Sequence, residues 1–384
     1  MVSYPELTLN YLHLLSGQHK CTLLLTQNVA QQTFFQLPDN IATHYVFNQH
    51  ELERYTRIIA NRKKSIWHKI RRECFRAYEQ FKYYQAIIRL IRQTQPDLII
   101  DFSGCADKFI RMPKSLLPSL PPTVRWVHNR LSSTPLKHRE YRKFHQTFQQ
   151  HTAIIAICRE MQQKLQTLFP DFADKIYVLH NPINLTDIRQ QAALISQSDL
   201  NILRPYLLQV ARLEHGKGHE ELIDIYAELK KRGLKHKIYF LGDGQNRASL
   251  EQKIRQLGLE QDCILLGTQH NPYPYFQYAD LFLHTSEHEG LPTVLMESMA
   301  CGVPIIAMDC PTGPKDILGA NSEYGCLIPM HDRTAFADAV LHLLKQPEQY
   351  QHYREQGLKR VQDFSMENIY KQLTELIQKI HDND

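Results

Sequence analysis

The sequence lacks the short patterns that mark several common kinds of site. Its eight cysteines are scattered and none forms a C-x-x-C pair, which argues against a zinc site and for a reducing compartment. The G-x-S-x-G sequence of serine hydrolases is absent, and so is a Walker A loop. The chemistry of this chain must therefore be sought in other motifs.

Long apolar runs are also absent. No stretch approaches the ~20 apolar residues of a membrane-spanning helix, and the N-terminus does not resemble a signal peptide. Hydrophobic residues make up 43% of the chain and charged residues 22%, which is ordinary for a soluble globular protein. A length of 384 residues favours two or more domains. We expect a soluble cytoplasmic enzyme.

Positive charge is concentrated in one segment. Residues 54–76 are rich in Arg and Lys and contain Trp67, although the whole chain has a formal net charge of only +5. Such a segment could lie on an anionic membrane surface, as a peripheral contact at the inner face of the plasma membrane. A solvated helix face is the plainer alternative. Nucleic acid ranks last, because no RNA-binding or helix-turn-helix pattern accompanies the charge, and we expect no nucleic-acid partner.

Strands and helices alternate along the chain, which predicts parallel sheets in an α/β fold. In the first half we expect a helix at residues 5–16, a helical basic region at 40–95, and strands at residues 20–26, 96–102, 123–128, 153–158 and 175–183. In the second half we expect a long final helix at 365–381 after a polar connection, and strands at residues 206–211, 237–241, 263–268, 281–283 and 303–307. The predicted domains are residues 1–190 together with 365–384, and residues 191–364.

The first half begins with a helix, whereas a nucleotide-binding α/β domain normally begins with a strand and a glycine-rich turn. That first strand is central in a doubly wound sheet. Its absence predicts a gap in the hydrogen-bond ladder or a rearranged sheet, unless the native start lies upstream.

The stretch from residue 281 to 318 contains two carboxylates near a helix start. Glu289 lies in the loop after a strand, and Glu297 is the one formal charge in an apolar helix at residues 293–301. The backbone N–H groups near Gly290 and Leu291 would face the same crevice with the positive end of the helix dipole. Carboxylates bind hydroxyls and a helix start binds phosphate, so a phosphorylated sugar fits both. The alternative is a buried, capping Glu297 and a solvated Glu289.

A second loop, after the strand at 206–211, carries Arg212 and Lys217. Two cations at this spacing can neutralise a diphosphate without metal, and Gly216 and Gly218 let the backbone approach it closely. The alternative is a pair of surface cations.

These motifs together resemble a known family. The string S-E-H-E-G-L-P-x-x-x-x-E-x-M-A-C-G-x-P, which holds Glu289 and Glu297, resembles the E-x7-E signature of the family 4 retaining glycosyltransferases, including bacterial lipopolysaccharide and polysaccharide enzymes. The R-L-x-x-x-K-G loop and G-D-G at 242–244 extend the resemblance over residues 206–320, and W-V-H and N-P-I carry it more loosely into the first half. It implies the GT-B fold, in which two Rossmann-like domains face a cleft and the C-terminal helix crosses back to the N-terminal domain.

The resemblance also implies roles for individual residues. Arg212 and Lys217 would hold the diphosphate of a nucleotide sugar, Glu297 the ribose, and Glu289 and His128 the transferred sugar. The implied donor-binding set is Arg212, Lys217, Gly242, Thr268, Gly290, Leu291 and Glu297. The implied catalytic set is Glu289, His128, Arg212 and Lys217.

The implied reaction moves a sugar, with retention, from a nucleotide sugar to a glycan hydroxyl, and we expect UDP as the nucleotide. Metal-dependent sugar transfer usually shows an internal D-x-D, whose one match here is Asp382-Asn383-Asp384 at the end of the sequence, so we expect no metal and no cofactor. The basic segment favours a lipid-linked or lipopolysaccharide-core acceptor. A nucleotide-sugar epimerase of GT-B fold and a non-catalytic sugar-nucleotide-binding protein are the alternatives.

Overall fold

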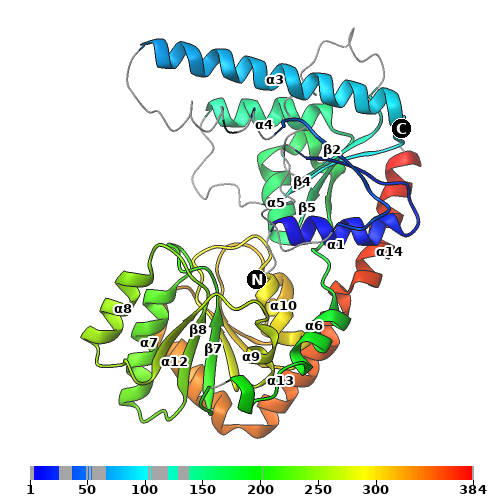
Figure 1. The fold of residues 1–384 in the computed structure, drawn as a ribbon. Coiled ribbons are helices and arrows are strands. Elements are labelled where there is room, and N and C mark those ends of the chain that lie inside the picture. Colours follow the sequence, from blue (N-terminus) through cyan, green and yellow to red (C-terminus); the bar gives the residue numbers. More distant parts are fainter. Residues whose placement is uncertain are drawn as a thin grey trace.

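The computed structural model describes residues 4–25, 37–48, 51, 53, 66–102, 104, 120–128, 138–200 and 202–382. They form two α/β halves, drawn one above the other in Figure 1. The chain crosses between the halves twice. The two crossings lie side by side, because the N–H of Ile183 donates to the carbonyl of Phe364 at 2.9 Å.

The C-terminal half is built on a six-stranded parallel sheet in the order β12-β11-β10-β7-β8-β9. Its strands are β7 (Tyr206–Val210), β8 (Lys237–Leu241), β9 (Cys263–Gly267), β10 (Leu281–His284), β11 (Ile305–Met308) and β12 (Cys326–Ile328). Every residue of β7, β10 and β11 is buried. Continuous burial is expected where helices cover both faces of a parallel sheet.

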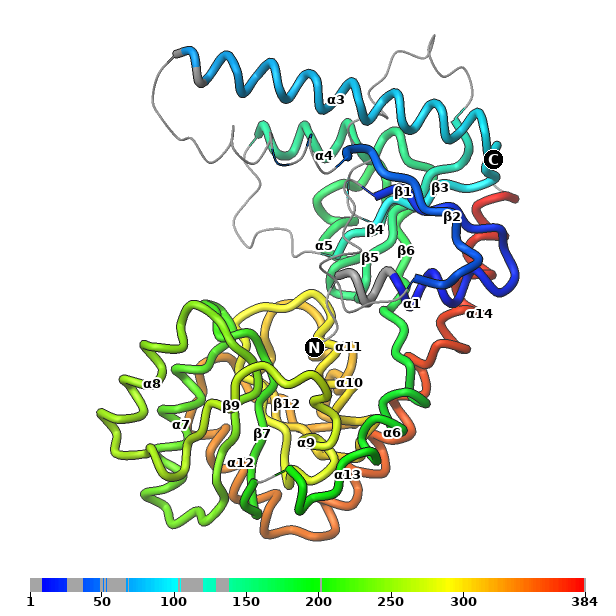
Figure 2. The backbone as a smooth tube through the Cα atoms, in the orientation of Figure 1, coloured from blue at the N-terminus to red at the C-terminus, as the bar shows by residue number. Residues whose placement is uncertain are grey.

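The N-terminal half contains two sheets among the described residues. One is four-stranded with the order β3-β4-β5-β6, and the other pairs β1 with β2. These strands are β1 (Thr22–Leu25), β2 (Ala42–Tyr45), β3 (Ile99–Asp101), β4 (Thr123–Val127), β5 (Ala153–Ala156) and β6 (Ile176–Val178). Leu24 of β1 and Ile99 of β3 both pack against Ile87 of the same long helix, α3 (Ile66–Thr94). Figure 2 shows the two sheets at one end of this half. The interruption predicted for the ladder is therefore present in the described part of the chain.

Helices cover the sheets and fill most of the connections. Besides α3 they are α1 (Tyr4–Ser16), α4 (His138–Gln150), α5 (Arg159–Leu168), α6 (Leu185–Ala193), α7 (His219–Lys231), α8 (Arg247–Gln256), α9 (Tyr273–Gln277), α10 (Thr293–Ala300), α11 (Pro314–Leu318), α12 (Arg333–Lys345), α13 (Pro347–Arg360) and α14 (Met366–Asp382). Three short 3-10 helices are also present among the described residues, and they are η2 (Pro170–Lys175), η3 (Ser198–Leu200) and η4 (Val361–Phe364).

Two expectations about local structure are wrong. Residues 42–45 lie inside the predicted helical region but form β2, because parallel pairing with β1 and burial of Val46 and Phe47 outweigh the helical pattern. The expected polar connection before the last helix is in fact α12 and α13. In α12 the buried side chains Phe336, Val340 and Leu343 recur at helical spacing.

The C-terminal helix α14 returns to the N-terminal half, as expected. It contacts α1, and the hydroxyl of Tyr370 donates to Gln18 Oε1 at 2.7 Å. The side chains of Ile369, Leu373 and Ile380 are buried on one face of the helix. The last helix therefore ties the two halves together.

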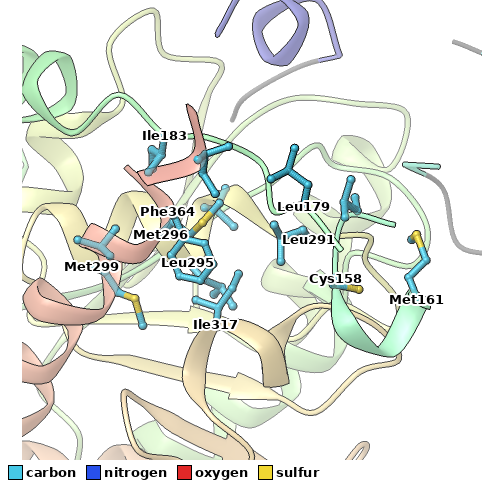
Figure 3. Close-up of a cluster of buried hydrophobic side chains, with 14 of the residues drawn as sticks. Cys158, Met161, Leu179, Ile183, Leu291, Leu295, Met296, Met299, Ile317 and Phe364 are labelled. Atoms are coloured by element: carbon cyan, nitrogen blue, oxygen red, sulfur yellow. The ribbon is translucent and has the colours of Figure 1, made fainter. Parts of the chain in front are cut away.

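An apolar seam joins the halves near α10 (Figure 3). Leu291 and Leu295 from the C-terminal half belong to the same buried cluster as Cys158, Met161 and Leu179 from the N-terminal half. Contiguous side-chain packing of this kind holds the carboxyl ends of the two sheets opposite each other.

Leu373→Ala tests whether α14 anchors the two halves. The side chain is 1% exposed, and a buried Leu-to-Ala change costs about 2–5 kcal/mol, so we expect the free energy of unfolding to fall by that amount in denaturant titrations. The neighbouring exposed Gln372→Ala is the matched control and should change stability by less than about 0.5 kcal/mol. Equal stability of both variants would contradict the role given to the helix.

Candidate active site

The predicted site residues come from three strand ends that face one another. The loops after β7 and β10 supply Lys217 and Glu289, and His128 follows β4 in the other half. A Cβ added to Gly290 would lie 2.5 Å from the carbonyl oxygen of His128, so the backbones of the two halves approach each other closely here. The carboxyl ends of parallel strands are where open α/β sheets bind ligands.

A largely buried ion pair connects the two loops of the C-terminal half. Lys217 Nζ donates to Glu289 Oε1 at 2.6 Å, and His284 Nε2 lies 3.7 Å from the same oxygen. His284 is 1% exposed, and both members of the pair are mostly shielded from water. An ion pair in such surroundings holds its partners far more firmly than an exposed one, because little solvent screens it.

The surroundings of this cluster decide which of its groups carry charge. Burial by itself raises the pKa of Glu289, but the neighbouring His284 and Lys217 lower it by more, so the carboxyl stays ionised. Burial lowers the pKa of His284 to about 4. The imidazole is therefore neutral near pH 7 and leaves Lys217 as the cation beside Glu289.

The backbone of the Lys217 loop is held close to the end of β10. Gln209 Nε2 donates to the Lys217 carbonyl at 3.2 Å, and the Thr285 hydroxyl donates to the Gly218 carbonyl at 2.9 Å. Gly218 has a φ of +70°, and a Cβ there would lie 1.8 Å from the Thr285 carbonyl oxygen. Only glycine fits this approach to the Thr285 backbone. The close approach of this loop to a diphosphate stays a prediction.

Arg212 takes a different position from Lys217. Its side chain is 62% exposed and its Nη1 donates to Glu214 Oε1 at 2.9 Å. Gly242 packs against the backbone of Ala211, the residue before Arg212, since a Cβ added to Gly242 would lie 2.0 Å from the Ala211 carbonyl oxygen. Gly242 also pairs with Gly267, which places the exposed Thr268 at the adjoining strand end. Arg212 and Lys217, which were expected to hold a diphosphate together, thus have different carboxylate partners in this structure. Their joint role stays a prediction.

The start of α10 is turned toward the N-terminal half. The side chain of Leu291 is buried in the apolar seam, while Gly290 approaches His128. Glu297 is fully buried within α10 and does not reach solvent. The structure therefore brings Lys217, Glu289, Gly290 and His128 together, and places Glu297 behind them.

His128 is mostly buried at the end of β4. Its ring stacks on Phe102 with centroids 5.9 Å apart. Burial, and then the charge of Arg125, lower the pKa of His128 to about 4. A neutral imidazole can donate or accept a hydrogen bond, which suits contact with a sugar hydroxyl.

Sequence reasoning gave no role to His284 or to Thr312. The Thr312 hydroxyl donates to the Glu289 carbonyl, so it fixes the backbone of the loop that carries the carboxylate. The available signal for His284 was the polar run His284-Thr285-Ser286 directly after an apolar strand. Across the described ranges no group of three or more His, Cys, Asp or Glu side chains could hold a metal ion, and metal independence stays a prediction.

Two family models match the chain. The model described as "Glycosyl transferases group 1" matches residues 191–360, and "Glycosyltransferase Family 4" matches residues 41–187. A Campylobacter jejuni N-acetylgalactosaminyltransferase, whose name includes a diphospho-undecaprenol, is 30% identical over 195 residues, 51% of this chain and 51% of that protein. The match thus spans about half the length of that relative.

Two further proteins are similar over most of their length. An uncharacterized glycosyltransferase of Methanocaldococcus jannaschii is 24% identical over 76% of this chain and 82% of its own. The crystal structure of Anabaena HepE in complex with UDP superimposes with a TM-score of 0.74 at 17% identity, covering 99% of this chain and 98% of that one. The fold is the GT-B arrangement of two Rossmann-like domains.

Gly218→Ala tests the close approach at the candidate site. Gly258, with a φ of +65° and nothing within 4 Å of an added Cβ, is the matched control, since it shares the backbone conformation without the clash. We expect Gly258→Ala to cost about 1–2 kcal/mol of stability. Gly218→Ala should cost distinctly more, because the Thr285 backbone must move. Thermal or urea unfolding measures both, and equal losses would rule out the steric constraint.

Proposed function

Because this chain belongs to the family 4 glycosyltransferases, we propose that it transfers a sugar from a nucleotide sugar to a glycan hydroxyl and retains the anomeric configuration. UDP is the proposed nucleotide. The carrying observation is the buried Lys217–Glu289 pair at the edge where the loops after β7 and β10 face His128 across the two halves. The similarity to a structure that contains UDP supports the choice of nucleotide.

The proposed roles follow from charge and position. Lys217 stabilises the negative charge that develops on the diphosphate when its bond to the anomeric carbon breaks. The acceptor hydroxyl oxygen bonds to that carbon from the same face, and its proton passes to the leaving phosphate oxygen. Glu289 accepts hydrogen bonds from hydroxyls of the transferred sugar, and the neutral His128 contacts that sugar from the other half.

Arg212 and Glu297 have roles that require movement. The Arg212 side chain is exposed and flexible enough to leave Glu214 and reach a bound diphosphate, since an exposed ion pair contributes little. Glu297 is the proposed partner of the ribose hydroxyls, and it becomes accessible only if the region around α10 opens. Domain opening and closure around the donor would supply both changes.

The proposed acceptor is a lipid-linked glycan of the cell surface. The name of the Campylobacter jejuni relative contains a diphospho-undecaprenol, which supports an acceptor carried on a polyprenyl diphosphate. Such a substrate is confined to a bilayer, so the enzyme would work at the inner face of the plasma membrane. No helix in the described part of the chain is long and apolar enough to cross a membrane.

The first half of α3 offers a surface for such peripheral contact. Its exposed large side chains Trp67, Ile70, Tyr78 and Phe81 are 70%, 46%, 41% and 54% exposed. At 100° per residue they share one face, and the packed residue Tyr83 lies on another. Arg71 flanks the exposed face, so apolar and basic groups would meet an anionic bilayer together. The part of the predicted segment before Ile66 lies outside the described residues.

Transfer activity tests the proposed chemistry. Lys217→Ala and Glu289→Gln should each lower UDP-sugar turnover about 10²–10³-fold, as expected when a group that stabilises transition-state charge is removed. Lys253→Ala is the matched control, because Lys253 makes a comparable 2.7 Å ion pair with Asp224 away from the cleft. Mass spectrometry of products with and without acceptor separates transfer from epimerisation and from binding alone. Wild-type turnover in both variants would end the assignment.

Vesicle sedimentation tests the membrane surface. Trp67→Ala combined with Phe81→Ala should lower partitioning onto anionic vesicles tenfold or more, since each buried aromatic side chain contributes roughly 1.5–3 kcal/mol. Arg71→Gln should weaken binding to anionic vesicles alone and leave neutral ones unaffected. Leu194→Ala, at a site that is also 70% exposed but in α6's C-terminal cap, is the control. Unchanged partitioning of the aromatic variant would refute this surface.

A further inference from the structure

Two carboxylates cross the boundary between the halves in opposite directions. Asp316 of α11, in the C-terminal half, accepts a hydrogen bond from the backbone N–H of Arg159, the first residue of α5 in the N-terminal half. Glu160 of α5 accepts in return from the backbone N–H of Gly313 at 3.1 Å. Each half thus supplies the acceptor for a backbone donor of the other.

The start of α5 has no acceptor of its own for this purpose. The residue before the helix is Cys158, which makes no side-chain capping bond, and the first N–H groups of a helix have no partner within it. Asp316 fills the place of a capping residue from the other half, where the helix dipole also favours a negative charge. His180 Nε2 and Arg159 Nε lie 3.9 and 4.0 Å from Asp316 Oδ1.

The same contact reaches the candidate site through residues 311–313. The Glu289 N–H donates to the Pro311 carbonyl at 3.3 Å, and Thr312 donates to the Glu289 carbonyl. An added Cβ on Gly313 would lie 2.8 Å from the Gly290 carbonyl oxygen. The loop whose Gly313 N–H donates to Glu160 is therefore the same loop that hydrogen-bonds to the backbone of Glu289.

We propose that Glu160 and Asp316 form a reciprocal latch, which holds the two halves closed and positions Glu289 toward His128. Both are positioning residues, since neither touches the proposed substrates. The apolar seam supplies most of the contact area, but it is non-directional. The two carboxylate bonds require a defined alignment of α5 with residues 313–316, so they select one closed arrangement. The effect on catalysis, but not the closure itself, rests on the proposed function.

Small-angle scattering of the full chain tests the closure without any need for activity. Glu160→Ala and Asp316→Ala should each increase the radius of gyration, and the double variant should add little to the larger single effect, because both bonds stabilise one closed state. Asp309→Asn is the control, as it removes a carboxylate of the same loop whose 2.6 Å ion pair with Lys315 stays within one half. Unchanged scattering of folded Ala variants would overturn the latch.

The conservative variants guard against a loss of folding. Asp316→Asn and Glu160→Gln keep an oxygen that can accept from a backbone N–H, so they should restore most of the closed form, and their thermal midpoints show whether the chain is intact. In transfer assays, the Ala variants should lower kcat about tenfold, because Glu289 would no longer be held toward His128. If the Ala variants open in scattering while neither the wild type nor any variant transfers a sugar, the latch would be retained and the proposed function rejected. Scattering that is equal in the Ala and conservative variants would reject the latch.

Discussion

The buried pair of Lys217 and Glu289 is the interaction on which the candidate site depends. It links the loops after two adjacent strands, β7 and β10, in a place where little water screens the charges. The neighbouring His284 is neutral near pH 7, so it adds no charge to the pair. Such a pair is costly to break on one side only, since the remaining charge would be buried alone. A polyanionic ligand with hydroxyl groups satisfies both partners at once, the phosphates taking Lys217 and the hydroxyls Glu289.

The pair can act together with His128 only if the N-terminal half faces it. Three features of the structure hold the two halves in this arrangement. The apolar seam around Leu291 supplies area, the returning helix α14 supplies a tether, and the carboxylates of Glu160 and Asp316 supply alignment. The apolar seam is the least directional of the three, and the two carboxylate hydrogen bonds are the most directional. The close approach of Gly290 to His128 is where their combined effect can be seen.

Much of this arrangement could be predicted from the residues. Strong alternation of apolar strands and helices placed β7 to β11 and α7 with small errors at their ends, and the late start at α1 predicted the interrupted ladder. The errors have physical causes. β2 is short and mostly exposed, so pairing with β1 decides its conformation. α13 is largely polar, with Tyr353 and Gly357 as its buried residues, whereas α12 has a clear apolar pattern that the sequence-based expectation missed.

The sequence by itself determined the fold class, the family and the loops that carry the charged groups, because these depend on local periodicity and on motifs with fixed spacing. Tertiary structure alone decided which groups meet. Arg212 is turned to solvent and Glu297 is sealed inside α10, whereas His284, Glu160 and Asp316, which no motif singled out, contact the site or brace it. Such contacts join residues up to 157 positions apart, as between Arg159 and Asp316, and no local pattern encodes that distance.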